Sequence, residues 1–410
     1  MRLLVIACAV LAPILPAEKV SSPGPWTLDA ALVIKAKRVI TVSGADITDG
    51  IVLIVDGKIK AVGKDIAIPD GATIIEAAVV MPGLVNASSS YGLPNRANEE
   101  AREVTPDARA IDDCDGGSGE FKRAVQTGVT TAYVGPGDRN VIGGLGAAVK
   151  TAGGKLPSRI ISSDVALKAA FGPSPSRGNY SPRSFAPTNF YARRPTTRMG
   201  VTWECRKAFI EAKKYRDDKE ANDDGKEILL RVLDKKLVLR VSASRATDIE
   251  AVLKIVEEFG FDIMLEEADE AYRHIEALAR RKIPVLYRAS FQTRTIYSRD
   301  GSEERFTTFA DLVKAGVKTA LLPTGDAESE GLLATATFTV KYGAAPAEAL
   351  RAITLTPAEL LGIANRVGSI EAGKDADLVL LNGDPLHITT RVERVLVDGK
   401  VVFGKPLAEY

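Results

Sequence analysis

The chain has 410 residues, with 54 basic and 53 acidic side chains and a formal net charge of +1. A net charge this close to zero gives no overall attraction to nucleic acid or to an anionic membrane surface, so neither is expected as a partner. Hydrophobic residues make up 45% of the chain, which is ordinary for a soluble globular protein with a large core. Only two histidines are present, His274 and His387, so neutral metal ligands and proton shuttles are scarce.

The first residues are typical of a secretory signal. Arg2 supplies a positive start, residues 3–15 are apolar, and the sequence turns polar after Ala17. The apolar run is too short to span a bilayer. We therefore expect residues 1–17 to be a signal peptide and the mature protein to be exported, periplasmic or secreted, with no transmembrane segment after cleavage. A buried N-terminal strand or helix is one alternative interpretation, and a lipoprotein site at Cys8 is another.

Cleavage of the signal would leave two cysteines, Cys114 and Cys205. They would be able to pair in an oxidising compartment, but their spacing matches no motif. The sequence leaves this pairing open.

Both ends of the chain are rich in strand formers. Asp56-Gly57 separates two short apolar runs near the N-terminus, and Asp398-Gly399 does the same near the C-terminus. Asp-Gly between such runs is the strongest short-range signal of a β-hairpin. Two similar segments at opposite ends most simply belong together, so we expect residues 30–78 plus 366–405 to form one composite β domain.

The middle of the chain alternates between strand and helix patterns. Residues 237–241 are expected to form a strand, after which Thr247 caps a helix that Gly260 ends. Strands at 262–265 and 283–287 continue the rhythm. This order predicts a parallel sheet with right-handed crossovers over residues 79–365. Whether that sheet is open or closed into a barrel does not follow from the pattern alone.

Residues 171–198 interrupt this rhythm with many prolines and arginines and with interleaved aromatic residues. Such a composition suits nucleic-acid binding. The neutral chain and the export signal argue against that interpretation, and we expect a long surface loop instead.

Two motifs resemble those of a known family. Residues 81–85, Met-Pro-Gly-Leu-Val, resemble the end of the first barrel strand in metal-dependent amidohydrolases, and residues 368–379 are similar to that family's C-terminal signature. Residues 135–144 and 197–200 look like its imidazolonepropionase-related branch. The resemblance implies an α/β fold, a (β/α)8 TIM-like barrel flanked by a β-sandwich built from both termini. It also implies, as the family activity, hydrolysis of C–N bonds in amides and cyclic amides.

The same resemblance locates a site at which this chain departs from the family. Members bind one or two divalent metals through histidines after the first, fifth and sixth barrel strands and an aspartate after the eighth, sometimes with a modified lysine. The matching positions here hold Ser88, Ser90, Ser242, Glu267 and Asp326, and Lys168 lies in the lysine-bearing segment. A serine hydroxyl is a poor zinc ligand at neutral pH, and without the ion nothing lowers the pKa of a bound water.

We therefore expect no metal and no cofactor. The expected ligand pocket is lined by Ser88, Ser90, Lys168, Ser242 and Glu267, with Asp326 as a vestigial catalytic group. His274 and His387 are expected to be surface or packing residues rather than catalytic ones.

Three functions stay open at this point. The first is a pseudoenzyme, an inactive barrel that binds a small-molecule ligand or keeps a vestigial pocket. The second is a hydrolase with a changed mechanism, which is metal-free or uses a metal held by carboxylates. The third keeps the family activity with unusual ligands, and the serine replacements argue against it. We prefer the first; ligand identity and oligomeric state are not fixed by the sequence.

Overall fold

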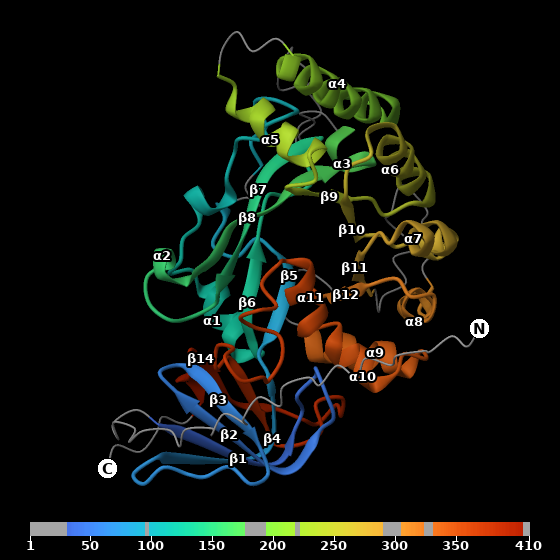
Figure 1. Ribbon diagram of the computed structural model, residues 1–410. Coiled ribbons are helices and arrows are strands. Elements are labelled where there is room, and N and C mark those ends of the chain that lie inside the picture. The colour runs from blue at the N-terminus through green and yellow to red at the C-terminus, as the bar shows by residue number, and fades with distance from the viewer. Residues whose placement is uncertain are drawn as a thin grey trace, which may run out of the picture.

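The computed structural model describes residues 31–94, 98–176, 194–217, 222–289, 305–323 and 331–404. These residues form two β-sheets with helices around them (Figure 1). The predicted signal peptide, most of the Pro- and Arg-rich segment and Asp326 lie outside the described residues. Within the described part, no helix has both the length and the apolar character needed to cross a bilayer.

Fifteen strands and eleven α-helices make up the described structure, together with the two short 3-10 helices η3 and η4. The strands are β1 (Leu32–Val39), β2 (Ile47–Val55), β3 (Lys58–Gly63), β4 (Thr73–Pro82), β5 (Leu84–Ser89), β6 (Val129–Val134), β7 (Ile142–Lys150), β8 (Ile160–Ala170), β9 (Val238–Ser242), β10 (Ile263–Glu267), β11 (Val285–Arg288), β12 (Thr319–Leu322), β13 (Leu378–Leu381), β14 (Val392–Val397) and β15 (Lys400–Gly404). The helices are α1 (Gly119–Gln126), α2 (Leu156–Arg159), α3 (Pro173–Ser176), α4 (Arg198–Asp217), α5 (Asp224–Leu233), α6 (Ala246–Phe259), α7 (Ile275–Arg281), α8 (Thr308–Lys314), α9 (Leu332–Lys341), α10 (Pro346–Arg351) and α11 (Leu355–Leu360), with η3 at Ala110–Asp113 and η4 at Ala271–Arg273.

The two ends of the chain share one seven-stranded sheet, in the order β15-β14-β13-β4-β1-β2-β3. Strand β13 pairs antiparallel with β4, so the last part of the chain continues the sheet begun by the first. In Figure 1 the blue and red strands accordingly lie together, below the barrel. The pairing of the terminal segments is as the two Asp-Gly hairpins indicate.

The two Asp-Gly turns contact each other, which means that the sheet curls until its outer hairpins meet. Gly57 has φ +75°, and a Cβ atom there would lie 2.8 Å from the carbonyl oxygen of Asp398. A Cβ on Gly399 would lie 3.1 Å from the Cα atom of Gly57. Both glycines are therefore required by close backbone approach as well as by conformation. The curled sheet encloses its own core, which includes Ile34, Ile54, Leu378 and Leu396.

The second sheet has eight strands in the order β12-β11-β10-β9-β8-β7-β6-β5 and is nearly closed into a barrel. Strands β12 and β5 are bridged by the chain that follows α10. The amide of Leu321 in β12 donates to the carbonyl of Ala352 at 2.9 Å, and the amide of Val85 in β5 donates to the carbonyl of Ile353 at 3.0 Å. The barrel with a second sheet confirms the expected fold class.

The barrel departs from strict β/α alternation at β7, which runs antiparallel to both β6 and β8. The expectation of a wholly parallel sheet is wrong at this strand. Residues 135–141, which join β6 to β7, are too few for the crossover helix that a parallel connection needs. The chain instead turns back on itself as a hairpin.

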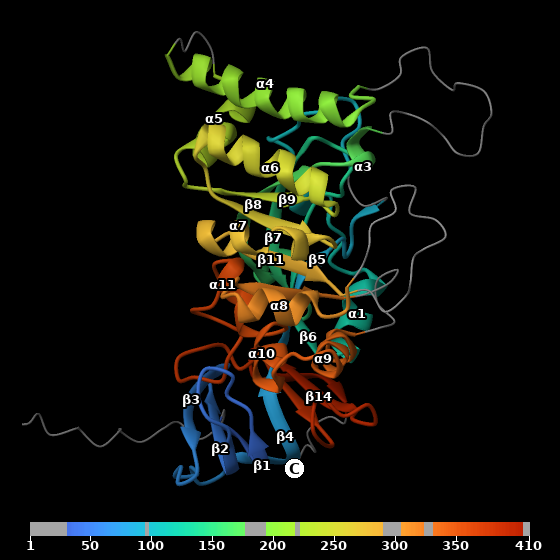
Figure 2. The same ribbon diagram turned by 90° about the vertical axis from the view of Figure 1, so that its right-hand side faces the viewer.

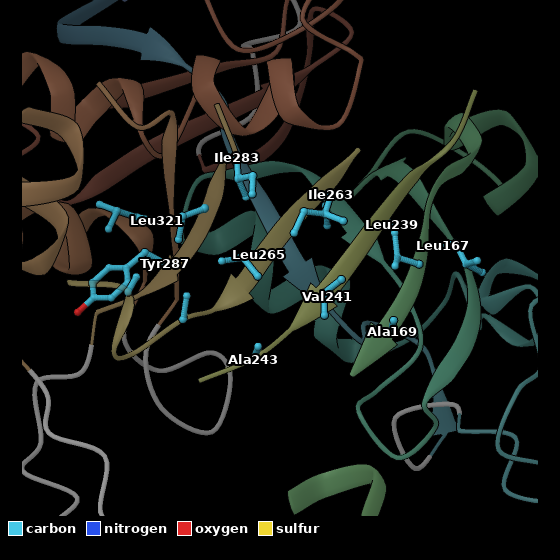
Figure 3. Close-up of a cluster of buried hydrophobic side chains, with 14 of the residues drawn as sticks. Leu167, Ala169, Leu239, Val241, Ala243, Ile263, Leu265, Ile283, Tyr287 and Leu321 are labelled. Atoms are coloured by element: carbon cyan, nitrogen blue, oxygen red, sulfur yellow. The ribbon is translucent and has the colours of Figure 1, made fainter. Parts of the chain in front are cut away.

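Helices α6, α7 and α8 follow one another along the outer side of the barrel strands (Figure 2). The strands pack apolar side chains against these helices, and Leu239, Val241, Ile263 and Leu265, which are labelled in Figure 3, belong to the same buried cluster as apolar residues of the three helices. Successive residues of a strand face opposite sides, so the alternate positions face into the barrel. This alternation directs Arg240 and Glu266 to the interior.

Helix α6 begins before the residue that the sequence indicates. Thr247 was expected to cap it, but the helix starts at Ala246, and its N-cap, Arg245, makes no side-chain cap bond. The amide of Ala246 instead donates to Oε2 of Glu270 at 2.8 Å. The carboxylate of Glu270, from the loop after β10, thus satisfies a backbone amide at the start of the helix, as a local N-cap side chain would. The end of the helix is as expected, with Gly260 left-handed at φ 77°.

The barrel and the terminal sheet are joined by a buried ion cluster. Lys150, at the end of β7, lies 2.7 Å from a carboxylate oxygen of Asp375 and 3.0 Å from one of Asp377, and it also contacts Asp398. Burial raises the pKa of Asp377 to about 6, against the opposing charge of Lys150. Asp375 and Asp377 belong to the C-terminal motif singled out in the sequence, and their place here is structural.

Candidate functional site: a charged centre in the barrel

The carboxylate of Glu266 lies inside the barrel and accepts four hydrogen bonds from three residues. Arg240 approaches it side-on, with Nε 2.8 Å from Oε2 and Nη2 2.5 Å from Oε1. The hydroxyl of Ser88 donates to Oε1 at 2.5 Å, and the ammonium of Lys168 donates to Oε2. These residues come from β5, β8, β9 and β10, and we call them the Glu266 centre.

The charged members of this centre are almost fully removed from water. The exposed fraction is 0% for Arg240, 3% for Glu266 and 4% for Lys168. Buried charges are tolerated when they are paired and hydrogen-bonded, because an unpaired one costs several kcal/mol. The centre meets that condition within its own side chains.

Each cation also has a second anchor. Arg240 donates from Nη1 to the carbonyl of Ala87 at 2.6 Å, and its guanidinium carbon lies 4.0 Å from the ring centroid of Tyr133. Lys168 lies 2.9 Å from Oδ1 of Asp138. The positions of both cations are therefore fixed by groups other than Glu266.

The charges of the Glu266 centre keep its carboxylate and its two cations ionised. Burial by itself would raise the pKa of Glu266, but the charges of Arg240 and Lys168 and their hydrogen bonds hold it well below its usual range. Burial would lower the pKa of Lys168, but the charges of Asp138 and Glu266 raise it above its usual value. Glu266 is thus a weak base and Lys168 a permanent cation at neutral pH.

A second ion pair lies at the strand ends beside the centre. Glu267 is 2.8 Å from Nη2 of Arg288 through Oε1, and Ser244 donates to its Oε2 at 3.1 Å. Burial, together with the nearby charges of Asp138 and Glu266, raises the pKa of Glu267 despite Arg288. The backbone of Glu267 is left-handed, with φ 68°, which is a strained conformation for a residue with a side chain.

Three of the residues expected to line a pocket belong to these two groups. Ser88 and Lys168 both bind Glu266, and Glu267 belongs to the neighbouring pair. Ser242 is buried at the end of β9, where its carbonyl accepts from the amide of Phe171 at 2.8 Å. Ser90 follows β5, and its carbonyl accepts from Leu93. Asp326 lies outside the described residues.

Sequence reasoning missed the residue at the middle of the site. It assigned the position after the sixth strand to Glu267, whereas the group that gathers Ser88 and Lys168 is Glu266. Arg240, Asp138, Arg288 and Ser244 were also missed. The sequence does carry a signal for Arg240 and Glu266. Both are charged residues at the alternate positions of largely apolar strands.

These side chains do not suit the divalent metal that the family resemblance implies. All four hydrogen bonds to Glu266 come from Ser88, Lys168 and Arg240, so its oxygens are already engaged, and two of the three donors are cations that would repel a metal ion. Among the residues described, no three His, Cys, Asp or Glu side chains are grouped so as to hold a metal. The donor set and the charges both disagree with a metal centre.

The two histidines and the two remaining cysteines lie away from this chemistry. Nε2 of His274 lies 2.9 Å from the carbonyl of Ala246, and His387 is exposed beside Thr389. Cys114 and Cys205 are free thiols in this structure, so the disulfide that the sequence left open is not formed here.

The architecture defines the class of protein: an α/β barrel with a second sheet from both termini and a charged barrel interior. A solved structure of an amidohydrolase from Thermotoga maritima MSB8 is 32% identical, covers 91% of this chain and 100% of its own, and superposes with a TM-score of 0.81. The amidohydrolase family profile matches residues 302–403. The chain belongs to the amidohydrolase family.

Two curated relatives add to this. The amidohydrolase tasK from Hapsidospora irregularis is 27% identical over 400 residues, which cover 87% of this chain and 39% of that protein. This chain therefore spans about two fifths of the length of that relative. An imidazolonepropionase from Phocaeicola vulgatus is 62% identical over 42 residues, 10% of each protein, in line with the branch that the sequence resembles.

Proposed function

We propose that this protein is a non-hydrolytic member of the amidohydrolase family, a pseudoenzyme in which the Glu266 centre replaces the metal centre. Its retained role is then to bind a small-molecule ligand at the barrel mouth. The observation that carries the proposal is the engagement of Glu266 by Arg240, Lys168 and Ser88. Family hydrolysis depends on a metal-activated water, and a centre closed by two fixed cations offers no place for that ion.

The same geometry argues against a serine nucleophile at Ser88. A nucleophilic serine needs a neighbouring base that can take its proton. The partner of Ser88 is Glu266, whose pKa is held low by Arg240 and Lys168. Lys168 is no substitute, because its pKa is raised and it stays protonated.

A second candidate function is metal-free hydrolysis at the neighbouring pair. The hydroxyl of Ser244 donates to Glu267, whose pKa burial raises above its usual value and which Arg288 holds in place. This is the arrangement of a hydroxyl, a base and an orienting group. It favours Ser244 and Glu267, rather than Ser88 and Glu266, as the residues of any remaining chemistry.

The test combines elemental analysis with an activity screen. The purified protein is exposed to zinc, manganese and magnesium, desalted and analysed for bound metal, then assayed on amides, cyclic amides and N-acyl amino acids. We expect no stoichiometric metal and no turnover. One equivalent of tightly held metal, lost together with activity in a Glu267→Ala variant, would overturn the proposal. Turnover that survives chelation but not Ser244→Ala would establish the second candidate.

A further inference from the structure

The groups around Glu266 have the form of a receptor for a carboxylate. Arg240 offers two parallel N–H donors to the two oxygens, Ser88 adds a hydroxyl to Oε1, and Lys168 adds an ammonium to Oε2. A side-on guanidinium with two parallel bonds is the geometry by which arginine recognises free carboxylates. The occupant here is a side chain of the same protein.

The receptor is held in place without its occupant. Arg240 is fixed by the carbonyl of Ala87 and by the ring of Tyr133, and Lys168 is fixed by Asp138. The amide of Ser88 donates to Oδ1 of Asn86 at 3.0 Å, which positions that residue as well. Donors that are preorganised in this way lose little conformational freedom when a ligand binds them.

The buried positive charge of this site would drive the binding of an anion in place of Glu266. Without the carboxylate of Glu266, Arg240 and Lys168 would be two buried cations, and Asp138 would be the only acid among the described residues in contact with either of them. An uncompensated buried charge is costly, so the emptied site would favour an anion strongly. The shape of the donors selects a planar, two-oxygen anion over a spherical one.

We propose that the barrel centre is a carboxylate-binding site, permanently filled by Glu266, and that it takes a free small carboxylate when that side chain is truncated. In the native protein this tethered carboxylate excludes external ligands from the centre. A ligand of the native protein would then bind above the centre, toward Glu267 and Arg288. The inference stands on the geometry of the centre and does not depend on whether the protein hydrolyses a substrate.

The test adds to each truncated variant a small carboxylate that matches the atoms which the substitution removes. Glu266→Ala deletes a methylene carbon and the carboxylate, which acetate replaces, and Glu266→Gly deletes one carbon more, which propionate replaces. Thermal midpoints are measured in the presence of chelator while sodium acetate or propionate replaces sodium chloride at constant ionic strength. We expect a saturable rise in the midpoint of each variant, with acetate more effective for Glu266→Ala and propionate for Glu266→Gly.

Several controls isolate the site. Acetamide, the neutral isostere of acetate, should not stabilise Glu266→Ala, and neither wild type nor Glu266→Gln, which keeps the space filled, should respond to acetate beyond chloride. Adding Arg240→Met to Glu266→Ala should abolish the response. Asp164→Ala serves as a matched variant, because Asp164 also binds two arginines, Arg109 and Arg231, but at the surface. It should show no saturable response.

If Glu266→Ala does not fold in chloride, its yield of soluble protein on refolding from denaturant becomes the measurement. A yield that rises with acetate and not with chloride or acetamide supports the proposal. Acetate that acts no better than chloride, by midpoint or by yield, overturns it, as does a response that persists with Arg240→Met. None of these measurements uses activity, so they can fail independently of the proposed function.

Discussion

Arg240 and Glu266 lie on adjacent parallel strands of the barrel, and both guanidinium contacts to the carboxylate are 2.8 Å or shorter. Arg240 is in register with Met264 rather than with Glu266, so the pair is diagonal across β9 and β10. Diagonal neighbours on a sheet are within reach of each other only when at least one side chain is long. The length of arginine is therefore part of the design of this centre.

The first prediction concerns the stability of that pair. Arg240→Met should lower the free energy of unfolding by about 3–5 kcal/mol, because it leaves Glu266 buried with one cation fewer. Adding Glu266→Gln should recover part of the loss, since it removes the stranded charge. Urea unfolding of both single variants, the double variant and wild type gives the interaction energy. Losses that simply add would contradict the coupling described here.

The second prediction concerns pH and the junction between the two sheets. The pKa of Asp377 is about 6 in the folded protein, against an ordinary value of 3.8, so the folded state binds this proton more tightly. Its contribution to stability is full below the ordinary pKa and is lost as pH rises through about 6. Between pH 5 and pH 8, wild type should lose about 1.4 kcal/mol relative to Asp377→Asn, which cannot titrate.

Urea unfolding of the two proteins across this range is the measurement for Asp377. The lowered pKa of the neighbouring Asp375 acts in the opposite direction, but both proteins share it, so it largely cancels in the difference. A difference between the two proteins that does not vary with pH would contradict the prediction.

The third prediction concerns the contact between the two Asp-Gly turns. Gly57→Ala places a methyl group 2.8 Å from the carbonyl oxygen of Asp398, so the backbone of that turn must shift, in addition to the cost of a left-handed alanine. Gly373 is the matched control, because it has φ +91° and nothing within 4 Å of the added carbon. We expect a loss of about 1 kcal/mol for Gly373→Ala and clearly more than about 2 kcal/mol for Gly57→Ala. Equal losses would mean that the turns do not press on each other.

The fourth prediction concerns export, which remains a proposal from the sequence. The positive residue Arg2 and the apolar residues 3–15 motivate it. Protein purified from its native host should begin shortly after Ala17, as read by N-terminal sequencing. Recovery of a chain that starts at Met1 or Arg2 from the cytosol would contradict it.

The fold was largely accessible from the sequence, and the reasons are local. Asp-Gly turns, apolar strand runs and the left-handed Gly260 each specify their own segment, and the structure agrees with them. The reversal of β7 was not accessible, because an apolar strand has the same pattern in either direction. The cap of α6 was also not accessible, since the carboxylate that provides it, Glu270, comes from a distant loop.

The site was accessible only in part. The family resemblance placed Ser88, Lys168 and Glu267 around one expected pocket, whereas in the structure Ser88 and Lys168 both bind Glu266. Which of two adjacent glutamates faces inward depends on strand alternation and on the unusual backbone at Glu267. The meeting of Arg240 with Glu266 depends on the register between two strands, which a single sequence does not encode in any local pattern.

The pairing of β4 with β13 has a consequence for biosynthesis. The partner strand of residues 73–82, Leu378–Leu381, is synthesised only after the barrel, which lies between the two strands in the chain. While the barrel is being made, the first sheet therefore has an open edge at β4, and open edges favour pairing with other chains. The barrel lies between these two segments in the chain and is complete first. Loss of strands β13 to β15 would thus leave this sheet permanently unfinished at β4, and the resulting chain would be prone to aggregate.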